Sequence, residues 1–199
     1  MNKIKKKYLF LIIIVIIGVI TGFIFANIIS NNDQKIVYEK ITYFFNNIKE
    51  DVHIKYWNNL LFSLKNNIIY LILITIFGLS IIGLFFNNFI LFLKSFILGF
   101  IASSIINIYL YNGIVLSIIY VFPFMILNLF TYLIMIAYAN DFSVKLFYLL
   151  FKKKEYNFHI IIKKYFTVSL ICLVLLLVSS LYETFITPFV LKLFSFLIK

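Results

Sequence analysis

The stretch FGLSIIGLFFNNFILFLKSFILGF, residues 77 to 100, is almost entirely apolar, yet it contains Asn87, Asn88 and Lys94. A helix needs about 20 consecutive apolar residues to cross a bilayer core of roughly 30 Å. Beyond this stretch, the 199-residue chain is 64% hydrophobic and only 13% charged. A water-soluble domain needs more polar surface than this, so the composition predicts an all-α, polytopic membrane helix bundle.

Apolar runs of the required length occur five times along the chain. We predict a single integral membrane domain, residues 1–199, with spans at about 8–29, 68–87, 89–111, 114–139 and 166–186. The first run is longer than the apolar core of a signal peptide, so we expect an uncleaved anchor. Its residues Gly18 and Gly22 have a spacing that allows close helix packing, within the chain or in a homo-oligomer. Packing within the chain is the favoured interpretation.

Two segments between the spans differ from them in character. In residues 30–67, apolar residues recur at steps of three and four, which predicts an amphipathic helix lying on the membrane or against the bundle. Residues 141–165 are rich in lysine, and we expect a basic loop whose apolar side chains, beginning with Phe142, rest on the lipid interface.

All 18 basic residues are lysines, and the formal net charge is +11. Cytoplasmic loops of membrane proteins carry an excess of positive residues. An inside N-terminus puts 11 lysines on the cytoplasmic side and 7 on the outer side. We therefore predict that 141–165 is cytoplasmic, that 30–67 is extracytoplasmic and that the C-terminus lies outside. Orientation accounts for the charge, so we expect no nucleic-acid partner.

Four polar or helix-breaking features lie within the apolar runs. Lys94 is predicted five residues from the cytoplasmic end of its span, as an anchor that snorkels to the headgroups or pairs with a partner's acid. Asn87 and Asn88 predict a turn between two spans, and Pro123 predicts a kink. Glu183 is predicted three residues from the outer end of the last span, where packing, partner contact and proton coupling all stay open.

Residues for enzymatic or metal chemistry are scarce. His53 and His159 are predicted on opposite sides of the membrane, and Cys172 is the only cysteine, placed within an apolar run. This pattern provides neither a usual metal site nor a disulfide. The chain contains no HExxH motif and no glycine-rich phosphate loop. We therefore expect a protein that is not an enzyme and that binds no metal or cofactor.

Some of these motifs resemble a known family. FGLSIIG (77–83) followed by LFLKSFILGF (91–100) is similar to the region that joins the second and third spans of the stage II sporulation protein M family. VFPF (121–124) and the closing YETFITP (182–188) also fit that family, as does the five-span layout. The matching positions are Gly78, Gly83, Lys94, Gly99, Pro123, Glu183 and Pro188.

The resemblance implies a multi-pass scaffold in a bacterial cell membrane. Such a scaffold would recruit or anchor peptidoglycan hydrolases, an amidase and a lytic transglycosylase, for septal wall remodelling and engulfment during sporulation. The alternative is a membrane component of a small-molecule transport system, which needs a polar cavity near the middle of the bilayer. The residues predicted to be available for a cavity are few: Asn107, Asn128, Ser103, Ser104 and Thr131. The sequence therefore favours the scaffold.

Overall fold

The computed structural model describes residues 3–50, 56–151 and 157–198, and these residues form helices and no strand. In chain order the elements are α1 (Lys3–Ile28), α2 (Asn31–Lys49), α3 (Tyr56–Gly78), α4 (Gly83–Phe151), α5 (Phe158–Leu181), the π-helical turn η1 (Tyr182–Ile186), α6 (Thr187–Leu193) and the 3₁₀ turn η2 (Ser195–Leu197). Five helical segments are long and apolar enough to cross a membrane. The protein is therefore a multi-pass, all-α membrane bundle, as predicted.

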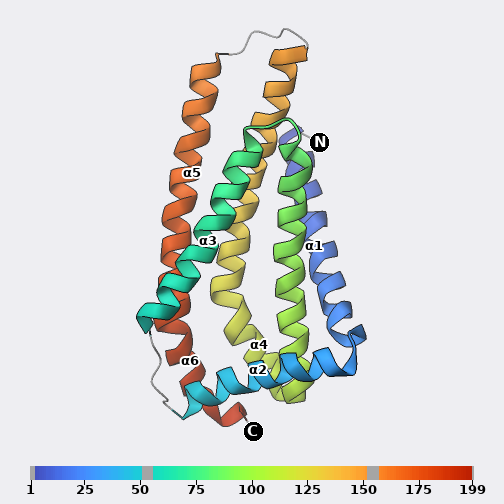
Figure 1. Ribbon diagram of the computed structural model, residues 1–199, viewed down its shortest axis with the longest axis vertical. Helices are drawn as coiled ribbons and strands as arrows, with labels where there is room; N and C mark the ends of the chain where they lie inside the picture. Colours follow the sequence, from blue (N-terminus) through green and yellow to red (C-terminus); the bar gives the residue numbers. More distant parts are fainter. Residues whose placement is uncertain (1–2, 51–55, 152–156, 199) are drawn as a thin grey trace.

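The long helices lie side by side along one axis, and the N-terminal and C-terminal ends are at opposite ends of the bundle (Figure 1). An odd number of crossings produces this arrangement. Which end faces the cytoplasm stays a prediction that rests on the distribution of lysines.

The helix α4 contains two spans that run in opposite directions (Figure 1). The chain reverses at Leu110, whose φ of 51° and ψ of −124° are not helical. Gly113 lies just beyond the reversal, where an added Cβ would be 2.6 Å from the carbonyl oxygen of Ile105. The reversal is thus too tight for a side chain at Gly113. It lies where the predicted spans 89–111 and 114–139 meet.

The turn between α3 and α4 occupies Leu79–Ile82, so the predicted turn at Asn87 and Asn88 is wrong. Within the turn, the Oγ of Ser80 accepts a hydrogen bond from the backbone of Ile82 at 3.3 Å. Both asparagines lie inside α4, where the Oδ1 of Asn88 accepts from the Nδ2 of Asn140 at 2.9 Å. One serine thus lies in the turn among apolar residues. Asn88 joins the two halves of α4 instead, whereas the buried side chain of Asn87 has no hydrogen-bond partner within the described residues.

Helices continue through segments that the sequence predicted to be loops. α3 begins at Tyr56 rather than near residue 68, and the predicted basic loop 141–165 is largely helical, with residues 152–156 outside the described part of the chain. Phe142, predicted to rest on the lipid interface, is buried against Tyr165, with ring centroids 4.9 Å apart. The expectation for Phe142 is therefore wrong, because α4 and α5 continue to pack against each other beyond their predicted ends.

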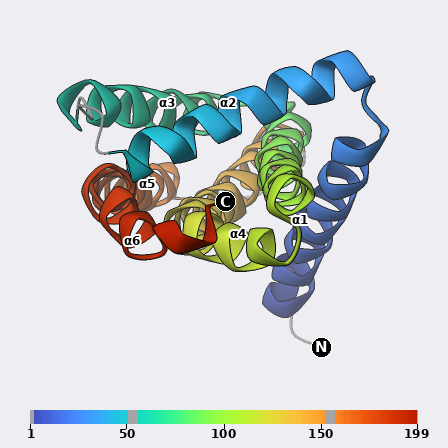
Figure 2. The same ribbon diagram turned by 90° about the horizontal axis from the view of Figure 1, so that it is seen from below.

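The helix α2 lies across one end of the bundle (Figures 1 and 2). It is the amphipathic helix predicted within residues 30–67. Ser30 caps its N-terminus by accepting a hydrogen bond from the backbone N–H of Asp33. On its inner face, Phe45 and Ile48 are buried in a cluster that also contains Leu191 of α6. This end of the bundle is therefore closed by packed side chains.

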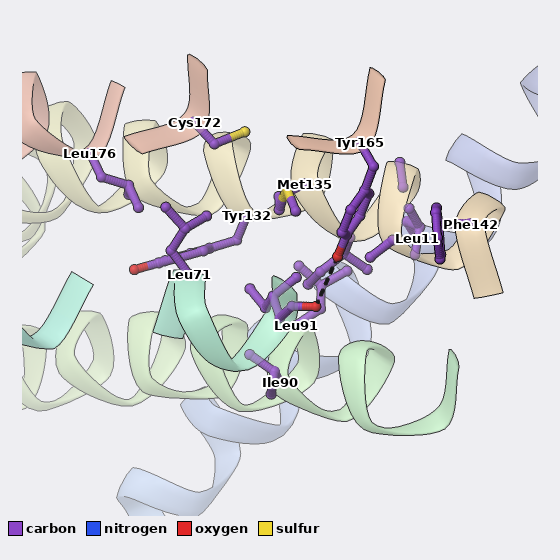
Figure 3. Close-up of a cluster of buried hydrophobic side chains, with 14 residues drawn as sticks. Leu11, Leu71, Ile90, Leu91, Tyr132, Met135, Phe142, Tyr165, Cys172 and Leu176 are labelled. Carbon is purple, nitrogen blue, oxygen red and sulfur yellow. Dashed lines mark hydrogen bonds between the residues drawn. The ribbon is translucent and has the colours of Figure 1, made fainter. Parts of the chain in front are cut away.

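The main core lies between α1, α3, α4 and α5 (Figure 3). It includes Cys172, which is fully buried as a small apolar side chain. The hydroxyl of Tyr165 donates a 2.9 Å hydrogen bond to the carbonyl oxygen of Thr75, which ties α5 to α3. Tyr132 also belongs to this core, but its hydroxyl points away from the apolar side chains (Figure 3).

The helices α1 and α4 approach each other through glycines on both sides. A Cβ added to Gly18 would lie 2.7 Å from the Cβ of Ser95, and Gly22 lies against the same helix. Reciprocally, a Cβ added to Gly99 would collide with the backbone of Val19. Small residues allow this approach in membranes, where dispersion contacts between helices replace the hydrophobic effect. The glycine pair of the first span therefore packs within the chain.

Candidate functional site

A polar cavity of about 170 Å³ lies inside the bundle. α3 and the first half of α4 meet at the turn 79–82 and diverge toward the other end of the molecule (Figure 1). The cavity lies between these two arms, and its walls are completed by the second half of α4 and by η1. Its lining consists of Phe62, Ser63, Asn66, Asn67, Lys94, Ile97, Leu98, Phe124, Met125, Asn128, Leu129, Tyr132 and Glu183. Phe62 and Ile97 are exposed, so the cavity opens between the two arms.

Hydrogen bonds connect three helices around this cavity. Ser63 and Asn67 lie one turn apart on the same face of α3. The Oγ of Ser63 donates to the Oε2 of Glu183 at 2.5 Å, and the Nδ2 of Asn67 donates to the Oγ of Ser180 at 2.9 Å. From α4, the hydroxyl of Tyr132 donates to the Oδ1 of Asn67 at 3.0 Å. The cavity wall is thus a network that fixes α3 against α4 and α5.

The π-helical turn η1 carries Glu183. Pro188 lacks an N–H group and would clash with a carbonyl one turn earlier in a regular helix. In η1, the backbone N–H of Thr187 bonds instead to the carbonyl of Tyr182, five residues back. This wider turn lets the helix continue through Pro188 to Leu193. Ten more helical residues follow Glu183, so the helix extends beyond the predicted end of the span at residue 186. Single π turns are frequent at functional sites.

Lys94 also lies deeper than predicted. α4 begins at Gly83, so Lys94 is about 16 Å along the helix axis from its start. Its Nζ lies 3.5 Å from the centroid of the Tyr70 ring and 5.2 Å from that of Tyr132. A cation over a desolvated aromatic face gains on the order of 2 kcal/mol. Lys94 is thus held inside the bundle by aromatic rings. The prediction of a snorkelling anchor is wrong, because the preceding turn lies earlier in the sequence.

Several polar atoms of the cavity have no hydrogen-bond partner within the described residues. The Nζ of Lys94 has no acceptor there, and Glu183 uses only its Oε2. The Oδ1 of Asn128 is buried and unpaired. Lys94 and Glu183 attract each other electrostatically, but they form no direct ion pair. The cavity therefore presents a cation, an anion and a free amide oxygen to whatever enters it.

Metal binding at the cavity would require a cluster of ligand side chains. Across residues 3–50, 56–151 and 157–198, no group of three or more His, Cys, Asp or Glu residues is arranged to hold a metal ion. The only acid in the cavity lining is Glu183.

The family model described as Stage II sporulation protein M matches residues 11–188. The chain belongs to the Stage II sporulation protein M family. The match covers all five membrane-spanning segments, so the family assignment applies to the whole bundle. No curated protein and no solved structure matches the chain.

The positions that the sequence assigned to the Stage II sporulation protein M family do not gather in one place. Lys94 and Glu183 line the cavity. Gly78 and Gly99 lie at helix contacts, with Gly78 against Tyr165 and Ala139. The other three positions shape the backbone. Gly83 is the first residue of α4, Pro123 lies within α4 where the backbone stays helical, and Pro188 is the second residue of α6. The structure thus separates a charged pair in a cavity from residues that shape the backbone.

Most of the cavity's polar lining was not predicted from the sequence of this Stage II sporulation protein M family member. Of the five candidates, only Asn128 lines the cavity. Asn107 and Ser103 bond to Asn27 of α1, and the remaining two bond to carbonyls of their own helix. Ser63 and Asn67 have a signal that could have found them, a spacing of four on one face of a helix, but their span was predicted to begin only after them.

Proposed function

We propose that this protein is a non-enzymatic membrane scaffold that recruits or anchors peptidoglycan hydrolases at the bacterial cell membrane. The expected partners are an amidase and a lytic transglycosylase, and the process is septal wall remodelling and engulfment during sporulation. Membership of the Stage II sporulation protein M family carries this proposal. The family match supports a role in sporulation, and the scaffold role is our inference from it.

The closed end of the bundle supports the proposal, because a scaffold needs a rigid surface. The Nζ of Lys49 in α2 donates to the carbonyl oxygen of Ile198 at 2.8 Å. The Nδ2 of Asn112, next to the reversal of α4, donates to the carbonyl oxygen of Leu197 at 3.2 Å. These bonds attach α2 and the reversal to the C-terminal segment. Under the predicted orientation, this end faces the cell wall.

The outer face of α2 offers the contact surface. Ile36 and Tyr43 lie seven residues apart, so they share one face of the helix, opposite the buried Phe45. Their side chains are 51% and 69% exposed, which leaves two large apolar groups free for a partner. Glu39 and Lys40 lie beside them and are exposed as well. An apolar pair within a charged rim is typical of protein interfaces.

A capture experiment tests this proposal. The tagged protein would be solubilised from membranes and incubated with the amidase and the lytic transglycosylase encoded by the same genome. We expect the wild type to retain at least one enzyme and the double variant Ile36→Ser, Tyr43→Ala to retain much less. Phe85→Ala removes an aromatic side chain that is 70% exposed, but at the opposite end of the bundle, and should have no effect. Failure of the wild type to retain either enzyme would refute the scaffold.

The polar cavity favours a second candidate, a membrane component of a small-molecule transport system. Transport sites lie near the bilayer midplane, between helices that are often discontinuous. The cavity lies well inside α3 and α4, and η1 interrupts the α-helical pattern beside it. Uptake into vesicles that contain the purified protein distinguishes this candidate. A scaffold gives no uptake above that of empty vesicles, whereas a transporter does.

A further inference from the structure

The cavity contains polar and charged groups, and leaving such groups unpaired inside a membrane protein costs free energy. A buried polar group that lacks its hydrogen bonds is destabilising, and no water in the bilayer core replaces the missing partner. Here the Oδ1 of Asn128 is buried and has no partner within the described residues. The half-buried ammonium of Lys94 contacts the rings of Tyr70 and Tyr132 but has no hydrogen-bond acceptor there, and the half-buried carboxylate of Glu183 accepts one hydrogen bond, from Ser63. These three groups come from the two halves of α4 and from η1, and they line one cavity.

The chemistry of these groups defines what would satisfy them. The ammonium of Lys94 needs an anionic acceptor, because it has three N–H donors. The carboxylate of Glu183 and the amide oxygen of Asn128 both need donors, and Glu183 also needs a positive charge. A simple anion would leave Glu183 unpaired, and a simple cation would leave Lys94 unpaired. A molecule with both charges satisfies all three groups.

We propose that the cavity between α3, α4 and η1 binds a compact zwitterion, in which one anionic group and one ammonium group lie a few ångströms apart. The anionic group binds Lys94, and the ammonium group binds Glu183 and Asn128. The α-amino acids have this chemistry, and so does the headgroup of phosphatidylethanolamine. The proposal is independent of the scaffold function, because it concerns the interior of the bundle and not the outer face of α2.

The size of the cavity limits the ligand. The cavity has a volume of about 170 Å³. This is below the range of about 300–1,000 Å³ that is usual for drug-sized ligands. A small amino acid such as alanine therefore fits the space, whereas a nucleotide is far larger. A lipid headgroup would reach the site through the opening beside Phe62 and Ile97.

Three probes test the charge requirement on the unmodified protein. Alanine carries both charges, propionate lacks the ammonium group, and isopropylamine lacks the carboxylate. Each would be titrated at millimolar concentrations into the protein in non-ionic detergent, with binding followed by calorimetry and by the shift in Tm. We expect alanine to bind at least about tenfold more tightly than either analogue, the loss typical of one missing charge-assisted hydrogen bond.

Matched pairs of variants test whether alanine binds in the cavity. Lys94→Met and Glu183→Gln keep the shape of each side chain, and each should weaken alanine binding by about tenfold or more. Lys65→Met and Glu39→Gln make the same changes at exposed positions of α3 and α2, and binding should be unchanged. Asn128→Leu serves as a further cavity variant if either charge variant does not fold. Equal binding by cavity and surface variants would overturn the assignment.

A second experiment, with two kinds of lipid, distinguishes a lipid headgroup from a free amino acid as the bound zwitterion. The protein would be placed in nanodiscs of phosphatidylethanolamine or of phosphatidylcholine, whose quaternary ammonium cannot donate a hydrogen bond. A higher Tm in phosphatidylethanolamine that disappears in Lys94→Met identifies the lipid headgroup. Alanine binding without this lipid effect identifies a free amino acid. If neither probe binds in a way that depends on Lys94, the cavity takes no zwitterion and the proposal is wrong.

Discussion

The close contact of α1 with α4 predicts that adding a single methyl group at Gly99 lowers the stability of the protein. In Gly99→Ala, the new Cβ would lie 2.9 Å from both the carbonyl carbon and the Cα of Val19, and closer still to its oxygen. An ordinary contact begins at 3.4 Å, so the two carbon contacts alone require a separation of 0.5 Å, and the nearer carbonyl oxygen requires more. The atoms encountered belong to the backbone, which cannot rotate away as a side chain can. The dispersion contacts along the interface weaken as the gap widens.

The expected cost of Gly99→Ala follows from two opposing effects. Overpacking a well-packed interface costs about 1–3 kcal/mol, and the upper end applies because backbone must move. Replacing glycine by alanine in a helix returns about 1 kcal/mol. We therefore expect a net loss of about 2 kcal/mol, which shifts the unfolding equilibrium roughly 30-fold.

Unfolding in mixed micelles with increasing SDS, followed by the fluorescence of the single tryptophan Trp57, measures this loss. Phe89→Ala is the control, because it lies on the same helix with a side chain that is 49% exposed and adds no atom to the contact of α1 with α4. If Gly99→Ala is as stable as the wild type while the control behaves as expected, the close approach of α1 and α4 does not exist in the membrane.

Two further predictions concern the orientation and the closed end. Reporters that are active only outside the cytoplasm should give a signal when fused at Lys199 and none at Lys153, and the reverse pattern would contradict the orientation. Phe45→Ala should cost about 3–5 kcal/mol, because the ring is 1% exposed, and should make α2 sensitive to protease. Tyr43→Ala is the neighbouring control, with a side chain that is 69% exposed, and equal sensitivity of the two variants would show that α2 does not pack on the bundle.

The sequence predicts the fold class and the number of spans because apolar runs of fixed length have one stable solution in a bilayer. It also locates the reversal of α4, where Asn112 and Gly113 interrupt two long runs. It does not locate the turn before α4, since Ser80 forms that turn among apolar residues while two asparagines nearby are a stronger turn signal. This error moves the start of a helix by six residues and makes Lys94 appear to lie at an interface.

The cavity escapes prediction for a related reason. Ser63 and Asn67 precede the apolar run of α3, so they are counted as part of a loop, although the helix begins at Tyr56. Glu183 is assigned to a helix end because the apolar run was taken to stop at residue 186, whereas the helix continues through Pro188 to Leu193. A π-helical hydrogen bond allows the helix to continue through the proline, and neither the composition nor the periodicity of the sequence indicates this bond. Depth within the membrane is therefore the property that the sequence predicts least well here.

The extra residue in the π-helical turn η1 also sets the direction in which side chains before the turn point, relative to side chains after it. Each residue turns an α-helix by about 100°, so deleting one residue between Glu183 and Leu191 would rotate one of them by that angle relative to the other. Glu183 bonds to Ser63 in the cavity wall, whereas Leu191 is buried in the cluster under α2. Such a rotation would break at least one of these two contacts. The seven residues between Glu183 and Leu191 should therefore tolerate substitutions far better than any change in their number.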